Sequence, residues 1–316
     1  MAVIGLQSSI WSNRLKTIYL LILFPLFLFG LFYAVFFAMN YNSAVEFSQV
    51  LDSTNKIFLQ VISVLTPVLF VRMLISFFFY RQIIFKFSGA KAITRKENPE
   101  IYNIVENLCI SRGLPTPNIG ILEDDSMNAF ATGLSEKSAW IVFSRGLLNR
   151  LDKREIEAVA AHELTHIINR DSLLMVVIIV IIGAVATIGE IVFRWGLYSR
   201  PNSDSKDNSK ALLIMIGLVL MFLGYLIFPL VRLAISRKRE YLADAGAVEL
   251  TSDNRAMISA LEKISTDAQI ESIKKNTVAA LCIEDPKSKK EKRSFIGNLF
   301  STHPSVPDRI EALKKY

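Results

Sequence analysis

The stretch that decides the fold is 152-DKREIEAVAAHELTHIINRD-171. Asp152 and Glu155 stand where the two members of a capping box stand, so a helix is predicted to begin at Asp152. The apolar residues that follow recur at helical spacing, which extends the predicted helix through the pentapeptide 162-HELTH-166. Any chemistry carried by this pentapeptide therefore lies on a regular, rigid element.

The histidines of the pentapeptide, His162 and His166, are four residues apart and share one face of the helix, so both can reach a single metal ion. Glu163 lies beside them, where it can act on water at an open coordination position. A polar helix face that arose by chance is the alternative interpretation. The chain has only 3 histidines, and two of them stand here, which favours the metal site.

A zinc site needs a third protein ligand. The extended HExxHxxGxxH pattern does not supply it, because Asn169 stands where glycine is required and Ser172 where histidine is required. A second helix is predicted over 236–250, with Glu240 and Asp244 on one face. Glu240 can bind zinc directly, and Asp244 can hold the distal nitrogen of a ligand histidine. Two carboxylates at this spacing are often only a solvated face, so the assignment depends on the histidine pair.

The composition predicts membrane segments. Hydrophobic residues make up 52% of the chain, above the roughly 45–50% of globular domains. Four apolar runs have the roughly 20 residues needed to cross a bilayer: 17–39, 57–79, 172–193 and 211–231. The predicted fold is mainly α, with membrane hairpins at 1–80 and 172–231 and one soluble domain split between 81–171 and 232–316.

The distribution of lysine and arginine predicts the orientation of these segments. Most of the basic residues that flank the runs place both termini and the soluble domain in the cytoplasm, although those of the loop 194–210 disagree. Two runs separate His166 from Glu240, and an even number leaves both residues on one side, as a shared metal requires. The net charge of +7 does not indicate nucleic-acid binding, because no basic motif with interleaved aromatic residues accompanies it.

Four motifs together resemble the HtpX family of membrane zinc metalloproteases: MNAFATG at 127–133, HELTH at 162–166, KREYLADAG at 238–246 and STHPSVPDRIEAL at 301–313. The zinc-dependent CAAX prenyl proteases are more distant relatives. The resemblance implies a helical, zincin-like protease domain with one Zn²⁺ per subunit, in the cytoplasmic membrane of a bacterium. It also implies stress-related quality control, with membrane-protein substrates, the lipid bilayer and other membrane quality-control proteases as partners.

A small antiparallel sheet is predicted where 128–133 and the strand 139–144 form a hairpin. In the family that this chain resembles, the strand with this motif borders the cleft. Asn128, Ala129 and Phe130 would then bind an extended substrate through main-chain hydrogen bonds. A plain structural hairpin is the alternative.

The resemblance also gives roles to two residues near the C-terminus. His303 would stabilise the oxyanion and Arg309 would order the site, whereas a surface histidine and a salt bridge at a helix end are the alternatives. Two other functions stay open. A CAAX-type prenyl protease shares the metal site but normally has more membrane spans, and an inactive membrane scaffold would have lost a residue of the site.

Overall fold

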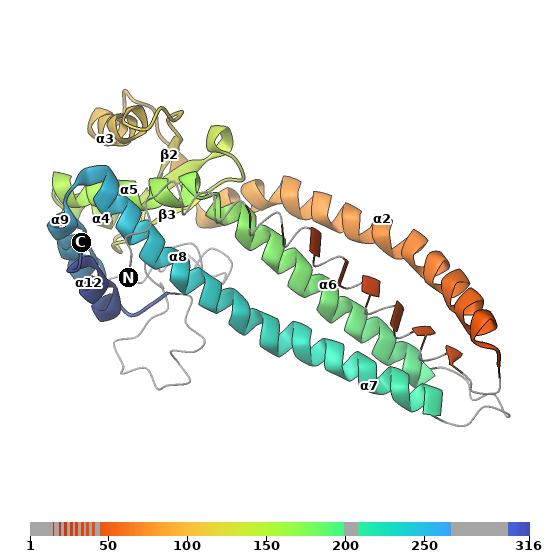
Figure 1. Ribbon diagram of the computed structural model, residues 1–316. Helices are drawn as coiled ribbons and strands as arrows, with labels where there is room; N and C mark the ends of the chain where they lie inside the picture. The colour runs from red at the N-terminus through yellow and green to blue at the C-terminus, as the bar shows by residue number, and fades with distance from the viewer. Residues whose placement is uncertain are drawn as a thin grey trace. The chain divides into compact units, whose positions relative to one another are not determined.

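The computed structural model describes residues 45–198, 208–266 and 303–316, together with isolated positions between 15 and 41. The chain forms two compact units: unit 1, with residues 1–15, 78–175 and 232–316, and unit 2, with residues 16–77 and 176–231. Three long helices, drawn in Figure 1, have residues in both units: α2 (Phe47–Ser88), α6 (Asp171–Tyr198) and α8 (Phe228–Thr251).

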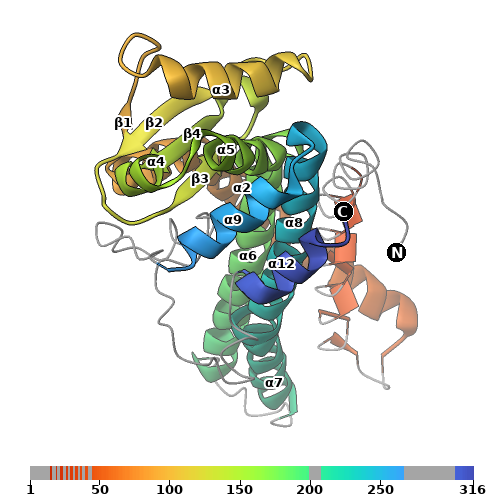
Figure 2. The same ribbon diagram turned by 90° about the vertical axis from the view of Figure 1, so that its left-hand side faces the viewer.

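Unit 1 combines a small sheet with short helices, which Figure 2 shows grouped together. The strands are β1 (Lys91–Ala92), β2 (Asn118–Leu122), β3 (Ala129–Thr132) and β4 (Trp140–Ser144). The helices that belong wholly to this unit are α3 (Pro99–Ile110), the 3₁₀ turn η1 (Glu136–Ser138), α4 (Arg145–Arg150), α5 (Lys153–Ile168), α9 (Asn254–Ile264) and α12 (Val306–Leu313).

The strand order in the sheet is β1-β2-β4-β3. The predicted hairpin is confirmed, since β3 pairs antiparallel with β4. The expectation of an antiparallel sheet is wrong, because β2 and β4 run parallel. The chain leaves β2 for the far edge, and the turn back from β3 gives β4 the direction of β2. The sheet is therefore mixed, and β3 is one of its edge strands.

Helix α5 begins as the sequence predicts. The Asp152 side chain accepts a hydrogen bond from the Glu155 amide at 3.0 Å, and the Glu155 carboxylate accepts one from the Asp152 amide at 2.8 Å. Glu155 is buried, and two side chains of α9 reach it: Ser259 Oγ at 2.6 Å and Lys263 Nζ at 2.7 Å. The capping carboxylate thus also joins α5 to α9.

Helix α8 approaches α5 closely because small residues line the contact. A Cβ built on Gly246 would lie 2.4 Å from Cγ2 of Thr165, so only glycine fits at this position. Ala243 and Ala247 on α8 are fully buried. The helix predicted over 236–250 is confirmed as part of α8. Its close approach brings the carboxylates of α8 to the histidine face of α5.

The core of unit 1 lies between the sheet and its helices. Helix α5 packs against β3, β4, α3 and α9, and α12 packs on α9. Phe143 of β4, Leu164 of α5 and Leu261 of α9 are almost fully buried in one continuous cluster. The site described below therefore sits on elements that a shared core holds in place.

Unit 2 is helical in the described residues. It consists of α7 (Asn208–Phe222), the π-helical turn η2 (Leu223–Ile227) and parts of α2, α6 and α8. Helices α6 and α7 run side by side (Figure 1), and glycine makes this contact possible. A Cβ built on Gly217 would lie 2.5 Å from the main-chain nitrogen of Phe193, and one on Gly224 would lie 2.7 Å from that of Ala186. The two backbones are therefore in direct contact.

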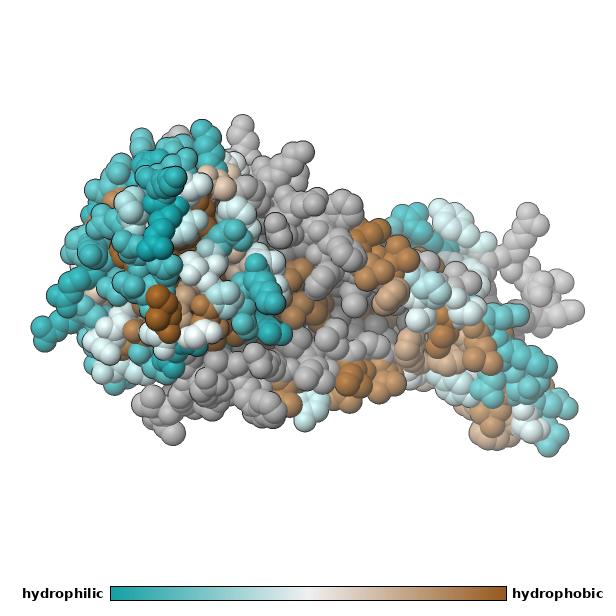
Figure 3. Space-filling model, turned by 90° about the horizontal axis from the view of Figure 1, so that it is seen from above, coloured by the Kyte–Doolittle hydropathy of each residue, from teal (hydrophilic) through white to brown (hydrophobic). Residues whose placement is uncertain are grey.

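Many large apolar side chains of unit 2 are exposed. In Figure 3 the described surface of unit 1 is mostly hydrophilic, and several hydrophobic patches lie on the described surface of unit 2. Each of the following side chains is at least half exposed: Phe70, Ile75, Ile191, Trp195, Met215 and Tyr225. Contiguous apolar surface on this scale marks a contact with lipid or protein.

No helix of the described residues combines the length and the apolarity that crossing a membrane requires. The four predicted spans therefore stay a prediction. Most of the first run, 17–39, and the centre of the loop 194–210 lie outside the described residues.

Candidate metal centre

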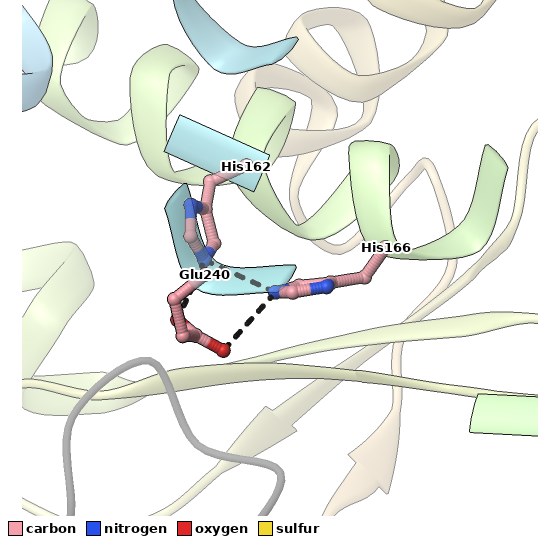
Figure 4. A group of neighbouring side chains, drawn as sticks. All are labelled: His162, His166 and Glu240. Carbon is pink, nitrogen blue, oxygen red and sulfur yellow. Dashed lines mark hydrogen bonds and ion pairs between the residues drawn. The ribbon is translucent and has the colours of Figure 1, made fainter. Parts of the chain in front are cut away.

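Three side chains of unit 1 converge on one point (Figure 4). His162 and His166 come from α5 and Glu240 comes from α8, and one donor atom of each lies within 4.8 Å of the others. His162 and Glu240 are buried, and the side chain of His166 is 15% exposed. Among the described residues, this is the group of histidine, cysteine and acidic side chains that could hold a metal ion.

The spacing of the donor atoms suits a tetrahedral zinc ion. The two Nε2 atoms of His162 and His166 are 3.2 Å apart, and the Glu240 oxygens lie 3.6 Å from one and 3.7 Å from the other. Ligand atoms about 2.0–2.2 Å from a tetrahedral zinc are roughly 3.3–3.6 Å apart from each other. Two imidazoles and a carboxylate also form the donor set of many catalytic zinc sites, with the fourth position left open.

Asp244 and Arg309 lie behind His162. The distal nitrogen of His162, Nδ1, is 3.0 Å from Oδ1 of Asp244. Arg309, fully buried on α12, donates to both oxygens of that carboxylate at 2.8 and 2.6 Å. Burial raises the pKa of Asp244, but the charge of Arg309 and its hydrogen bonds outweigh burial and lower it. Asp244 is therefore an anion that faces the histidine.

A second series of contacts, again from histidine to aspartate to arginine, lies behind His166. Its Nδ1 is 2.7 Å from Oδ2 of Asp171, the first residue of α6. Arg239 of α8 reaches Asp171 twice, with Nε 2.9 Å from Oδ1 and Nη1 donating to the main-chain oxygen at 2.9 Å. Asp171 and Arg239 are both buried. Each histidine therefore has an aspartate and then an arginine behind it.

Glu163 points into the same site from α5 and is 1% exposed. Neither carboxylate oxygen completes a hydrogen bond within the described part of the chain. Burial raises the pKa of Glu163 to about 7, although His162 and the nearby main-chain amide of Ala131 oppose the rise. A carboxyl group with this pKa can both accept and return a proton near neutral pH.

His303 is buried against the site, because 3% of it is exposed and its Nδ1 lies 3.4 Å from Oε2 of Glu240. The alternative of a surface histidine is therefore wrong. Burial raises the pKa of Glu240, but His303 and His162 outweigh burial and hold it well below its usual value. Arg309 is also 3.6 Å from this carboxylate. Glu240 is thus kept ionised, which is the form that binds metal.

The hydrogen bonds of the edge strand β3 show which groups face outward. The Asn128 oxygen accepts a hydrogen bond from the Ser144 amide at 2.9 Å, which makes residues 128 and 144 a hydrogen-bonded pair. Because such pairs alternate in an antiparallel ladder, the main-chain groups of Phe130 face β4, and those of Ala129 and Ala131 point away from β4 at the edge of the sheet, where both residues are buried. The Ala129 amide is already taken by Oδ1 of Asn128 at 3.0 Å.

The local sequence holds this strand firmly. The Ser144 hydroxyl donates to the main-chain oxygens of Ser126 and Asn128, at 2.6 and 2.9 Å, and accepts from the Asn128 amide at 2.9 Å. The Phe130 side chain is 1% exposed and belongs to the interior. Helix α5 packs against β3, and the main-chain amide of Ala131 lies near Glu163.

Comparison with known proteins gives the family. Residues 95–316 match the family described as peptidase family M48. The chain belongs to peptidase family M48. A protein named Protease HtpX homolog from Bacteroides fragilis is 39% identical over the whole of both chains, and one from Dictyoglomus thermophilum is 41% identical over 74% of each. The resemblance to HtpX is confirmed, and the M48 chain is a metalloprotease.

Solved structures include one that is similar to this M48 chain. The crystal structure of S. mikatae Ste24p aligns with a TM-score of 0.53 and 20% sequence identity, over 96% of this chain and 66% of that one. At this identity the likeness shows a common fold: a mainly helical chain with a small mixed sheet.

The site residues expected from the sequence of this M48 chain lie together in unit 1: His162, Glu163, His166, Glu240, Asp244, His303, Arg309, Asn128, Ala129 and Phe130. Asp171 and Arg239 were not expected to act at the site. Their signal was present, since Asp171 follows the second histidine by five residues and Arg239 precedes Glu240. The periodicity of α5 does not reveal Asp171, because this residue lies beyond the turn that ends the helix.

Proposed function

We propose that this chain is a zinc-dependent endopeptidase that cleaves misfolded or damaged membrane proteins at the cytoplasmic face of a bacterial membrane. The observation that supports it most is the convergence of His162, His166 and Glu240, with Glu163 buried beside them. An inactive scaffold would have lost at least one of these four residues, and all four are present.

Zinc is the metal that the three donors fit, and we assign one ion to each subunit. Two imidazoles and one carboxylate, at the separations given above, leave a position open as in catalytic zinc sites. When bound there, zinc supplies a Lewis acid that polarises the scissile carbonyl and makes nearby water more acidic. The protein contributes the orientation of the ligands through the carboxylates behind both histidines.

Glu163 is the proposed general base. Its carboxylate takes the proton of the attacking water and later passes it to the nitrogen of the leaving amine. A pKa raised by burial to about 7 suits both steps. The mechanism thus needs one acidic residue that changes protonation state twice in each turnover.

His303 is the proposed donor to the oxyanion. It is buried within 3.4 Å of the ligand Glu240, near the place where negative charge develops on the carbonyl oxygen. A donor there stabilises the transition state more than the bound substrate. Arg309, which contacts both Glu240 and Asp244, is proposed to order the site rather than to take part in the chemistry.

The substrate is proposed to bind as an additional strand beside β3, with Asn128, Ala129 and Phe130 as its binding segment. The main-chain oxygens of Ala129 and Ala131, which point away from β4, would be its partners, while the buried Phe130 side chain anchors the strand from within. Strand addition of this kind gives affinity through the main chain. It places the scissile bond across the face of α5 that carries Glu163.

A membrane location is proposed from two facts. The sequence has four apolar runs of spanning length, and unit 2 exposes large apolar side chains over wide areas. Lipid would cover this surface and remove it from water. The basic residues around the runs favour cytoplasmic termini and a cytoplasmic active site. Other membrane quality-control proteases are candidate partners.

The test is to reconstitute the purified protein with zinc in liposomes and offer two substrates together. One is an unprenylated membrane protein with cytoplasmic loops, and the other is a farnesylated peptide that ends in a CAAX sequence. We expect cleavage of the loops, and none by the matched Glu163→Gln variant. Cleavage confined to the farnesylated peptide would favour a prenyl protease instead, and no cleavage of either would favour the scaffold.

A further inference from the structure

We infer that Asp171 and Arg239 are positioning residues that fix His166 as a metal ligand, in parallel with Asp244 and Arg309 behind His162. This inference rests on the proposed function, because it concerns the same site. It assigns a role in metal affinity to two residues that touch neither the metal position nor the substrate edge.

The contacts that support it are short and buried. Nδ1 of His166 is 2.7 Å from Oδ2 of Asp171, and Nε of Arg239 is 2.9 Å from Oδ1 of the same carboxylate. Arg239 also holds the main-chain oxygen of Asp171 at 2.9 Å. Asp171 is 2% exposed and Arg239 is 8% exposed. One arginine therefore fixes both the side chain and the backbone of the aspartate.

The turn between α5 and α6 makes this arrangement possible. Arg170, the residue before Asp171, has φ +53°, in the left-handed region that non-glycine residues rarely occupy. The backbone turns here after the end of α5, and the side chain of Asp171 lies against His166 in the last turn of that helix. A strained residue is retained where the surrounding contacts determine its conformation, and the bonds of Arg239 to Asp171 are such contacts.

The physical reason for a positioning role is the two-sided nature of imidazole. A hydrogen bond from Nδ1–H to a carboxylate leaves the lone pair on Nε2, the atom that faces His162 and Glu240, and it prevents rotation of the ring. The carboxylate in turn is stable in a buried place only when it is paired. Arg239 supplies that partner. Removing either residue should therefore loosen the ligand without removing any donor atom.

The experiment measures zinc affinity by competition with a chelator, and the ¹¹³Cd NMR shift of the cadmium-loaded protein, for Asp171→Asn and Arg239→Met. We expect the affinity to fall about 10- to 100-fold for Asp171→Asn and about 10-fold for Arg239→Met. The cadmium shift should move in both, and Arg239→Lys should restore part of the affinity because it keeps a cation beside Asp171.

The matched control is Leu261→Ala, a fully buried position of the hydrophobic core on α9. It should lower thermal stability, yet it should leave the zinc affinity and the cadmium shift of the folded protein unchanged. If Asp171→Asn does not fold, Arg239→Met and Arg239→Lys still test the pair.

The outcomes separate this inference from the proposed function. Wild-type protein that binds zinc, together with unchanged affinity and cadmium shift in folded Asp171→Asn or Arg239→Met, would overturn the positioning role alone. A change of the cadmium NMR shift that is equally large in Leu261→Ala would also overturn the positioning role, because a general loss of stability would then explain the change. Wild-type protein that takes up no zinc would count against the proposed function and, with it, this inference.

Discussion

Glycine brings helices together in both unit 1 and unit 2, and in unit 1 buried charges accompany the contact. In unit 1, where Gly246 of α8 lies against Thr165 of α5, two aspartates and two arginines are arranged behind a pair of histidines. In unit 2, Gly217 of α7 and Gly224 of η2 lie against the backbone of α6. Burying charge is unfavourable unless every group is paired, whereas packing of small residues requires no pairing.

The difference shows where function is concentrated. Paired buried charges fix the directions of side chains, which a metal site needs, and their loss should change chemistry before it changes the fold. Close backbone packing fixes only the distance between helices, so its loss should change local stability before chemistry. Four substitutions test this division.

Glu240→Ala should abolish zinc binding and with it all cleavage, because the site loses one of three ligands. The measurement is the zinc content of the purified protein, with wild type prepared in parallel. The neighbouring change Asp244→Ala should keep the three ligands and weaken zinc affinity only about 10- to 100-fold. Full zinc occupancy in Glu240→Ala would remove this residue from the ligand set.

Glu163→Gln should lower the rate of peptide cleavage about 10²- to 10⁴-fold, because the substitution removes the base and leaves its shape. Zinc content should stay at the wild-type level, since Glu163 is not among the three ligands. Single-turnover cleavage of casein, with zinc measured on the same sample, checks both parts. A near wild-type rate would contradict the assigned base.

His303→Ala should lower kcat about 10²-fold with little change in KM or zinc content, because an oxyanion donor acts in the transition state. Steady-state kinetics on a peptide substrate separate the two constants. Pro304→Ala, at the neighbouring buried position, controls for a general disturbance of the segment. A loss of zinc equal to the loss of rate would instead make His303 a support of Glu240.

Gly217→Leu should destabilise the contact of α6 with α7 by about 1–3 kcal/mol, because the side chain must displace the Phe193 backbone. Zinc affinity should stay unchanged, since no residue of the metal site lies in unit 2. Thermal unfolding in detergent micelles and zinc competition are measured together, with Val219→Leu at an exposed position of the same helix as the control. A fall in zinc affinity that accompanies the fall in thermal stability would contradict the division between the units.

The sequence was most informative where one local pattern carries the chemistry. The capping box at Asp152 and the spacing of His162 and His166 are properties of a single helix, so periodicity alone predicts them. The contact of α5 with α8 was harder to foresee, because it needed the complementarity of Gly246 and Thr165. The shared metal provided the missing constraint, since a zinc site needs a third ligand.

Features that depend on how the chain turns between two elements could not be predicted from a local sequence pattern. The parallel pairing of β2 with β4 follows from a crossing to the far edge of the sheet, which no hydrophobic pattern encodes. Asp171 reaches His166 only because Arg170 adopts a left-handed backbone conformation, and an arginine carries no sequence signal for that. The outward groups of Ala129 and Ala131 depend on register, which the hydrogen bond of Ser144 fixes.

The proposed binding of substrate at the edge strand β3 has a consequence for how cleavage can be kept selective. An edge strand offers only main-chain amides and oxygens, and a segment can accept them only when its own are not already engaged in a helix or a sheet. Recognition of this kind reads whether a chain is folded and is nearly blind to which residues it contains. On the proposed mode of binding, a native neighbour would be spared without a specific inhibitor, and the same neighbour would be degraded once a loop or a helix end has unfolded.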